Sequence, residues 1–413
     1  MWPRGGLWRD GAFLRLWAGQ AISELGSRVT VLALPLGAIL VLHASAFQVA
    51  LLRTFEVAPL LLFALPAGVW IDRVRRRPLM IAADVVSALA LASIPLAYWT
   101  GTLSLAEVYA VAFVVGALAV VFDVAYLSFL PSLLPPERLA DGNAKLQATR
   151  SATESAGPAV AGVLVGLFTA PVAILADAVS FAASALLVGS IRRPEERVEV
   201  ERRRLGTELA EGVRYVFAQP YLRTLTTWSA GWSFFNSGFL ALMVVYLVRG
   251  LGLSATTVGW ILGLGSLGGV LGALVSARVV ARFGIGPTIA VSGVLSSLGI
   301  FGLPLAPRAF PHPVVIAGEI VATGFGMLFN VNQLTLRQAI TPPRLMGRMN
   351  SVVRLMYWGM GPVGAVVGGA LASWIGVRPT LWVEAVGATV VMIPLLVSPL
   401  LRLRRPEEVA VLA

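Results

Sequence analysis

The chain has 413 residues, of which 57% are hydrophobic and only 13% are charged. So few polar side chains cannot cover a water-soluble globule of this size, which excludes an ordinary soluble protein and indicates a chain that crosses a membrane many times. The net charge of +11 does not indicate a nucleic-acid partner, because no soluble domain combines a basic patch with exposed aromatic side chains. Cysteine is absent, which excludes disulfides, thiolate metal sites and thiol catalysis.

Twelve apolar stretches are each long enough, at about 20 residues, to cross a hydrocarbon layer of ~30 Å. Their expected ranges are 13–42, 47–71, 79–98, 105–131, 144–168, 171–190, 224–248, 256–281, 287–305, 312–337, 346–374 and 378–401. One long polar stretch, residues 191–223, separates six spans from six, and its part 207–217 has the pattern of an amphipathic helix. We therefore expect an all-α membrane protein with an N-terminal six-helix bundle over 1–190, a cytoplasmic linker and a C-terminal six-helix bundle over 224–413.

The second half of the chain repeats the first. Several residues recur 207 positions later: Phe122 as Phe329, Pro135 and Pro136 as Pro342 and Pro343, Asn143 as Asn350, and Asp177 as Glu384. Earlier in each half the displacement is 209, which pairs Ser45 and Ala46 with Ser254 and Ala255. Such a duplication in an apolar chain predicts two pseudo-symmetric bundles, and it is typical of transporters that bind their substrate between the repeats.

Arginine is concentrated in the segments that this arrangement places on one side of the membrane. With the amino terminus inside, the expected outer loops hold only Arg249, Arg308 and Arg378. Because basic loops stay inside, both termini are expected in the cytoplasm, with the first span itself directing insertion. Lys145 is the only lysine, and such a preference for arginine is expected from a GC-rich genome, so we expect a bacterial inner membrane.

The loop between the second and third spans carries a distinctive motif. It reads Gly68-Val69-Trp70-Ile71-Asp72-Arg73-Val74-Arg75-Arg76-Arg77. This segment resembles the signature loop of the major facilitator superfamily, although Arg75 stands where that family usually has glycine. The resemblance extends over the whole chain through the twelve spans and the repeat, and it implies the major facilitator fold and a secondary transporter.

In that family the loop acts as a gate, so the resemblance implies a gating role for five residues. They are Gly68, Asp72, Arg73, Arg76 and Arg77. Asp72 is the candidate latch, and its implied partner is the start of the eleventh span around residues 346–348. The alternative is that the arginines only set the membrane topology.

Gly157 and Pro158 in the fifth span, echoed by Gly361 and Pro362 in the eleventh, resemble the antiporter motif of exporters in this superfamily. Proline bends a membrane helix and glycine lets a neighbour approach closely. The resemblance favours export, although importers also carry kinked helices. Segments 13–20, 122–126 and 177–181 further resemble the branch that contains enterobactin-type exporters and macrolide efflux proteins.

Charged side chains inside the membrane cost roughly 2.5 to 3.5 kcal/mol each, so each needs a partner or a task. Glu24 and Arg28 are four residues apart and share one face of the first span. The superfamily lines its cavity with the first, fourth, seventh and tenth spans. Glu24, Asp123 and Glu319 are therefore candidates for proton coupling, with a purely structural Glu24–Arg28 pair as the alternative.

Two further pairs of charged residues are expected to be structural. Arg150 and Glu154, four apart in the fifth span, are expected to serve as an ion pair within the bundle or as a strut between helices. Asp177 and Glu384 match across the repeat but fall on the peripheral sixth and twelfth spans.

Polar and aromatic side chains complete the expected cavity lining. The candidates are Gln20, Arg28, Tyr126, Trp232, Asn236, Asn330, Asn332 and Gln333. Such a surface suits a bulky, largely apolar molecule with a few hydrogen-bonding groups. Neither a phosphate-binding GxxxxGK loop, an HExxH pair nor a GxSxG nucleophile elbow occurs, so we expect no enzyme, no cofactor and no metal.

The sequence thus predicts a monomeric secondary transporter that exports a drug- or siderophore-like molecule by proton antiport with alternating access. Its expected partners are the substrate, protons and membrane lipid. Two alternatives remain open, namely an uncoupled or lipid-handling facilitator and a membrane sensor or scaffold without turnover.

Overall fold

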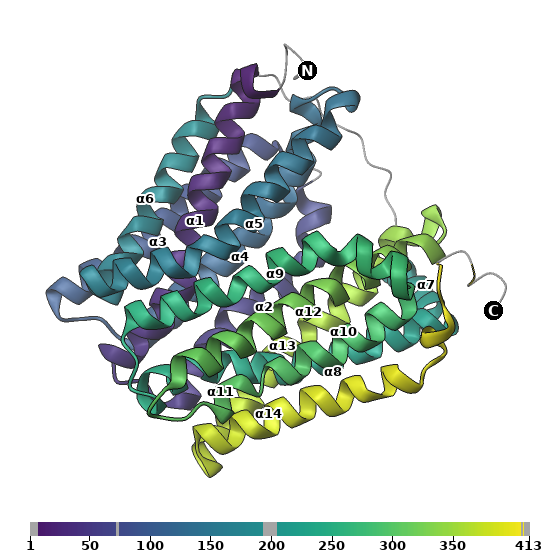
Figure 1. Ribbon diagram of the computed structural model, residues 1–413. Coiled ribbons are helices and arrows are strands. Elements are labelled where there is room, and N and C mark those ends of the chain that lie inside the picture. The colour runs from purple at the N-terminus through teal and green to yellow at the C-terminus, as the bar shows by residue number, and fades with distance from the viewer. Residues whose placement is uncertain (1–6, 72–73, 193–204, 406–407, 409–413) are drawn as a thin grey trace. The chain divides into compact units, whose positions relative to one another are not determined.

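The computed structural model describes residues 7–71, 74–192, 205–405 and 408, and of residues 64–71, 136 and 205–208 it describes the backbone alone (Figure 1). All regular structure in these residues is helical, as expected. The chain forms two compact units. Unit 1 comprises Met1–Ala44, Phe55–Glu201 and Ser254–Trp260, and unit 2 comprises Ser45–Thr54, Arg202–Leu253 and Ile261–Ala413.

The first half of the chain contains six long helices (Figure 1). They are α1 (Gly11–Leu40), α2 (Ala46–Ile71), α3 (Arg76–Thr100), α4 (Leu105–Leu133), α5 (Pro136–Leu167) and α6 (Ala170–Gly189). A short 3-10 helix, Leu7–Arg9, precedes α1. The side chain of Asp10 begins α1 by accepting hydrogen bonds from the amides of Ala12 and Phe13, which satisfies two free amides of the first turn.

The second half begins with α7 (Leu205–Ala218) and continues with a second set of helices. These are α8 (Pro220–Val245), α9 (Ala255–Phe283), α10 (Ile285–Gly299), the single turn α11 (Gly302–Leu305), α12 (Pro311–Ile340), α13 (Met346–Ile375) and α14 (Val377–Met392). A π-helical segment, Tyr246–Gly250, follows α8, and 3-10 helices occupy Pro343–Leu345, Ile393–Val397 and Pro399–Arg402.

Eleven helical segments among the described residues are long and apolar enough to cross a membrane. The twelfth expected span, 144–168, lies in α5. This helix has 32 residues and is therefore about 48 Å long, more than the ~30 Å of a hydrocarbon layer. Charged residues such as Lys145, Arg150 and Glu154 lie in the part of α5 up to residue 154, which is why α5 as a whole is less apolar than the other spans.

The helix boundaries confirm the internal repeat. Helices α2 and α9 begin 209 residues apart, as do α3 and α10, whereas α6 and α14 begin 207 residues apart. The repeated Ser45 and Ser254 cap equivalent helices, because their hydroxyls accept from the amides of Gln48 (3.3 Å) and Thr257 (3.2 Å). Because equivalent helices begin with the same capping residue, the displacement of 209 residues between the two halves can be read in the sequence.

Helix packing follows the same plan in both halves. Helix α1 packs against α5 and α6, and α3 packs against α4 and α6. In the same order, α8 packs against α13 and α14, and α10 packs against α12 and α14. Each unit therefore buries its apolar faces with an equivalent set of neighbours.

Each unit has its own apolar core. The core of unit 1 includes Phe13, Leu16, Met80, Phe129, Leu130 and Val188. The core of unit 2 includes Tyr221, Leu225, Ile289, Leu336, Leu395 and Leu400. The core of unit 1 joins α1 to later helices of its half, and the core of unit 2 joins α8 to later helices of its half, so each unit positions its own polar residues.

A buried carboxyl group occupies a related place in each unit. Asp177 of α6 is fully buried, accepts a hydrogen bond from Thr30 (2.5 Å) and packs against Gly26 of α1. Glu384 of α14 packs against Gly238 of α8 in the same way. Because any side chain at either glycine would collide with a carboxyl group, these four residues serve helix packing in both units.

The amphipathic helix expected at 207–217 is confirmed as α7. It packs against α8 and α13 through buried Val216. The hydroxyl of Tyr215 donates to the carbonyl oxygen of Ile340 (3.0 Å), and Glu211 forms an ion pair with Arg348. These contacts attach α7 to the end of unit 2 where α12 stops and α13 begins.

Candidate functional site

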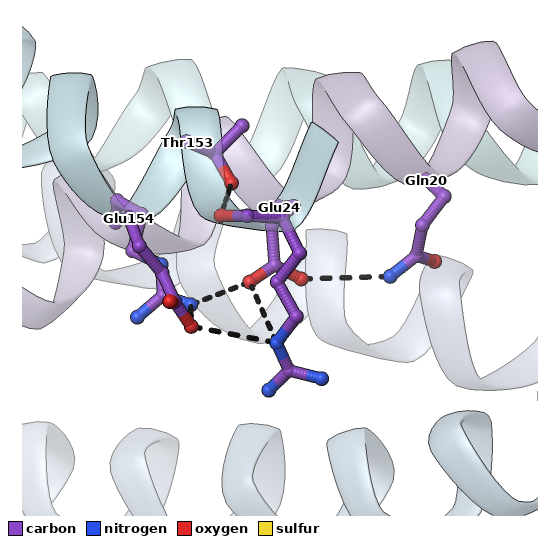
Figure 2. A network of polar contacts seen from close by, with 6 residues as sticks. Gln20, Glu24, Thr153 and Glu154 are labelled. Carbon is purple, nitrogen blue, oxygen red and sulfur yellow. Dashed lines mark hydrogen bonds and ion pairs between the residues drawn. The ribbon is translucent and has the colours of Figure 1, made fainter. Parts of the chain in front are cut away.

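A network of charged side chains joins α1 to α5 within unit 1 (Figure 2). One guanidinium nitrogen of Arg28, Nη2, donates to Glu24 Oε1 at 2.6 Å and to Glu154 Oε1 at 3.0 Å. Arg150 Nε lies 3.4 Å from the same Glu154 oxygen and 4.0 Å from Glu24 Oε1. Two glutamates and two arginines from two helices therefore share a single polar cluster.

Local helix geometry positions these side chains. Glu24 and Arg28 lie one turn apart on α1, and Arg150 and Glu154 lie one turn apart on α5, so each pair occupies one helix face. Gln20, one turn before Glu24, brings its Nε2 to 3.5 Å from Glu24 Oε2. Glu24 is the most enclosed of the charged groups, with its side chain 16% exposed.

Gly157 makes the bridge between the helices possible. A Cβ atom at this position would lie 2.7 Å from Arg28 Cγ and would also collide with Arg28 Cβ. The absence of a side chain thus lets the stem of Arg28 cross α5 and reach Glu154. Pro158 follows within α5 and has no amide hydrogen, so the carbonyl of Glu154 lacks its usual helical donor.

Helix α4 contributes a third carboxylate to this region. Arg150 interacts electrostatically with Asp123 as well as with Glu24 and Glu154. Asp123 is exposed, whereas Tyr126, one turn further along α4, is buried and stacks on Phe122. Two of the three residues expected to couple protons, Glu24 and Asp123, therefore face the same arginine.

Glu319, the proton-coupling candidate in unit 2, lies in a different environment. Glu319 of α12 packs its side chain against Gly265 of α9. The hydroxyl of Thr323, one turn later, donates to the carbonyl oxygens of Gly265 (2.7 Å) and Glu319 (2.8 Å). Glu319 thus lies at the contact between α9 and α12, and the described residues offer it no ion pair.

Three amide side chains follow on α12. Asn332 is buried and donates to the hydroxyl of Ser276 on α9 (3.0 Å), which ties these two helices together. Gln333 donates to the amide oxygen of Asn330 (3.3 Å), and Asn330 itself is exposed. On α8, Trp232 and Asn236 are half-buried. Their roles in substrate binding stay predictions.

The expected gating loop is described only in part. Asp72 and Arg73 lie outside the described residues, and Gly68 lies in the last turns of α2. Arg76 opens α3 and is buried. Arg77 donates to the carbonyl oxygens of Val188 (3.2 Å) and Gly189 at the end of α6, so this arginine has a structural partner in its own unit.

The second kink also has a partner within its unit. Gly361 and Pro362 lie inside α13, and the hydroxyl of Thr54 in the first turns of α2 donates to the carbonyl oxygen of Pro362 (3.4 Å). Arg348, one of the expected latch partners, pairs with Glu211 of α7. A contact between Asp72 and residues 346–348 stays a prediction.

Sequence reasoning placed Arg150 and Glu154 outside the site, as an ion pair within the bundle or as a strut between helices. The structure shows the pair and also connects it to Glu24 and Arg28. The partners on α1 could not be identified from the sequence, because residues 126 positions apart show no sequence pattern. Gly157, interpreted as the glycine of a kink that lets a neighbour approach closely, marks the place where the helices meet.

Comparison with known proteins decides the family. The family model described as Major Facilitator Superfamily matches residues 16–365. The chain belongs to the major facilitator superfamily. It is accordingly a multi-pass membrane transporter with the major facilitator fold and not an enzyme, as the sequence predicted.

Similar sequences include transporters named for efflux. The chain is 25% identical over 391 residues to the multidrug efflux pump Tap of Mycolicibacterium fortuitum, covering 90% of this chain and 92% of that protein. It is 24% identical over 382 residues to macrolide efflux protein A of Streptococcus pyogenes, covering 89% and 90%. The resemblance to the macrolide-efflux-like branch is thereby confirmed.

Solved structures of other transporters show the same fold. The nucleoside transporter NupG superposes with a TM-score of 0.73 at 11% identity, covering 94% of this chain and 98% of that one. An inward-facing bacterial homologue of the iron transporter ferroportin superposes with a TM-score of 0.73 at 19% identity, covering 94% and 99%. At these identities the likeness concerns the fold alone.

Proposed function

We propose that this superfamily member exports a bulky, largely apolar small molecule in exchange for protons, and that the α1–α5 network is its coupling site. The observation that carries the proposal is the shared nitrogen of Arg28, which bonds to Glu24 at 2.6 Å and to Glu154 at 3.0 Å. A proton that binds Glu154 therefore changes the contact between α1 and α5 directly, and a proton that binds Glu24 acts on that contact through the shared Arg28.

The carboxylates of the network support proton uptake. Glu24 and Glu154 share Arg28, and Arg150 interacts with both of them and with Asp123. A proton bound to any of these carboxylates changes the charge of the network. Because uncompensated charge is expensive away from water, the loaded and unloaded forms differ in the helix arrangement that they stabilise.

Protonation of Glu24 supplies a mechanism for coupling. Protonation removes the negative charge of the carboxylate and with it the Coulombic attraction to the guanidinium group, so the proton weakens the Glu24–Arg28 contact. Arg28 then shifts toward Glu154, and α1 changes its relation to α5. Alternating access follows when proton and substrate stabilise opposite arrangements.

Export of an apolar molecule is supported by the relatives and by the side chains of the cavity-lining helices. Relatives that cover about nine-tenths of the chain are named for multidrug and macrolide efflux. Tyr126, Trp232 and Asn236 combine aromatic surface with a few hydrogen-bonding groups, which suits a drug- or siderophore-like molecule.

The cellular setting completes the proposal. The bias of arginine toward one set of loops supports a bacterial inner-membrane protein with both termini in the cytoplasm. Its proposed partners are the exported molecule, protons and membrane lipid, and the proposed working form is a monomer.

Flux measurements in proteoliposomes test the proposal. A chemically varied panel first identifies a transported compound, and an imposed pH gradient is then varied at constant compound concentration. We expect flux to follow the gradient in the native protein and to lose that dependence in Glu24→Gln and Asp123→Asn. Asp141→Asn is the control, because Asp141 lies on α5 but pairs with Lys145 outside the network.

Other outcomes favour the alternatives. Flux that ignores the pH gradient, or transport that is unchanged after both network substitutions, contradicts proton antiport and favours an uncoupled facilitator. Movement of labelled lysolipid without drug flux favours a lipid-handling protein. Binding without any flux favours a sensor or scaffold.

A further inference from the structure

Arg337 of α12 is an unusual buried cation. Its side chain lies in the last turn of the helix, is only 8% exposed, and has a buried Nε atom without a hydrogen-bond partner. Burying a guanidinium group without a partner is costly. Within the described parts of the chain, no carboxylate forms an ion pair with Arg337.

A second cation increases this cost. Arg354 of α13 interacts electrostatically with Arg337, and the interaction is repulsive because both side chains are cations. Arg354 is exposed and likewise forms no ion pair within the described residues. Glu211 lies at the same end of unit 2, but it is engaged by Arg348. These two interacting arginines thus have no described counter-charge.

Gln333, one turn before Arg337, provides a second buried polar group without a hydrogen-bond partner. Its amide nitrogen donates to Asn330, whereas its Oε1 atom is buried and accepts no hydrogen bond. The region therefore offers strong donors from two arginines and one acceptor. A ligand that satisfies it must carry a negative charge and also a hydroxyl hydrogen.

We propose that Arg337, Arg354 and Gln333 form a binding site for a phosphate-type oxyanion. Guanidinium groups match phosphate oxygens through paired charge-assisted hydrogen bonds. A hydrogenphosphate P–OH or a hydroxyl of a glycerol headgroup supplies the donor that Gln333 lacks. The shared chemistry is a phosphate with a nearby hydroxyl, which occurs both in free phosphate and in phosphatidylglycerol. The site is independent of the α1–α5 network and of proton coupling.

Binding to the purified, delipidated full-length protein tests the site. The first arm titrates inorganic phosphate and follows thermal unfolding at constant ionic strength, with chloride as the reference anion. The second arm reconstitutes the protein into nanodiscs of phosphatidylcholine with and without phosphatidylglycerol and compares its thermal unfolding. We expect one of these probes to bind the native protein, which identifies the source of the phosphate.

Substitutions then locate the binding. Removing a hydrogen bond to a charged group should lower the affinity at least about tenfold in Arg337→Gln and in Arg354→Gln. Arg344→Gln is the matched control, because it removes the same charge from an exposed residue at the same end of unit 2 and should change the affinity less than about twofold. Arg354→Gln keeps the test valid if the buried Arg337 is needed for folding.

Two results would overturn the proposal. One is the absence of any effect of phosphate and of phosphatidylglycerol on the native protein. The other is an equal loss in Arg344→Gln, which would show nonspecific attraction to a basic surface. Proton-coupled flux should be unchanged in these variants, because the phosphate site does not depend on proton coupling.

Discussion

Replacing Gly157 by alanine should separate the two ion pairs of Arg28. A Cβ atom at position 157 would lie 2.7 Å from Arg28 Cγ, whereas non-bonded carbon atoms stay about 3.5 to 4.0 Å apart. The new Cβ atom would also collide with Arg28 Cβ, whose position is fixed by the backbone and does not change with the rotamer. Helix α1 must therefore move away from α5 by about 1 Å. The 3.0 Å contact of Arg28 with Glu154 then lengthens to about 4 Å, beyond hydrogen-bonding range.

The contact between Arg28 and Glu24, at 2.6 Å, lies within α1 and should survive. Overpacking costs about 1 to 3 kcal/mol, and the better helix propensity of alanine returns up to about 1 kcal/mol, so the free energy of unfolding should fall by no more than about 3 kcal/mol. We expect folded protein whose substrate flux no longer follows the pH gradient. Gly11→Ala is the control, because a Cβ there meets nothing within 4 Å.

A double-mutant cycle decides whether Gly157 acts through the bridge. Glu154→Gln weakens the bridge directly, so adding Gly157→Ala to it should cause little further loss of proton-coupled flux in proteoliposomes. Additive losses, or native flux in Gly157→Ala alone, would refute the reasoning.

Three substitutions test the contacts that organise the units, each by unfolding in detergent and by flux. Arg77→Met removes donors from the carbonyl end of α6 and should destabilise the protein by about 1 to 2 kcal/mol; native stability would show that this contact contributes nothing. Asp177→Ala leaves Thr30 without its buried acceptor and should cost about 1 to 3 kcal/mol, with Asp177→Asn milder because it keeps an acceptor; equal costs would contradict the hydrogen-bond argument. Asn332→Leu removes the bond to Ser276 and should cost about 1 kcal/mol without changing flux. Lost flux at unchanged stability would instead identify Asn332 as a substrate contact.

The helical plan could be predicted because its signals are local. Apolar runs of about 20 residues indicate spans, and a 3.6-residue pattern indicated the linker helix that is observed as α7. The caps at Ser45 and Ser254 also act within one turn, so equivalent helix starts remain visible in a diverged repeat. Helix α5 is the expected span that length and apolarity identify least well, because its first half is polar.

The candidate site was predicted only where its residues share a helix. Four-residue spacing indicated the Glu24–Arg28 pair, since such residues face one another on any helix. The same spacing indicated Arg150–Glu154, but nothing in the sequence joined the two pairs. Arg77 was predicted from its motif to act in a gate, and its contact with the end of α6 was not foreseen.

By itself, the sequence determined the membrane environment, the two-fold repeat and the individual helices, because hydropathy and helical periodicity act over short stretches of chain. Only the tertiary structure decided that Arg28 crosses Gly157 to bridge Glu24 and Glu154, and that Arg337 and Arg354 interact without a described counter-charge. Such contacts depend on how closely two helices approach, and that distance is determined by packing across the whole unit.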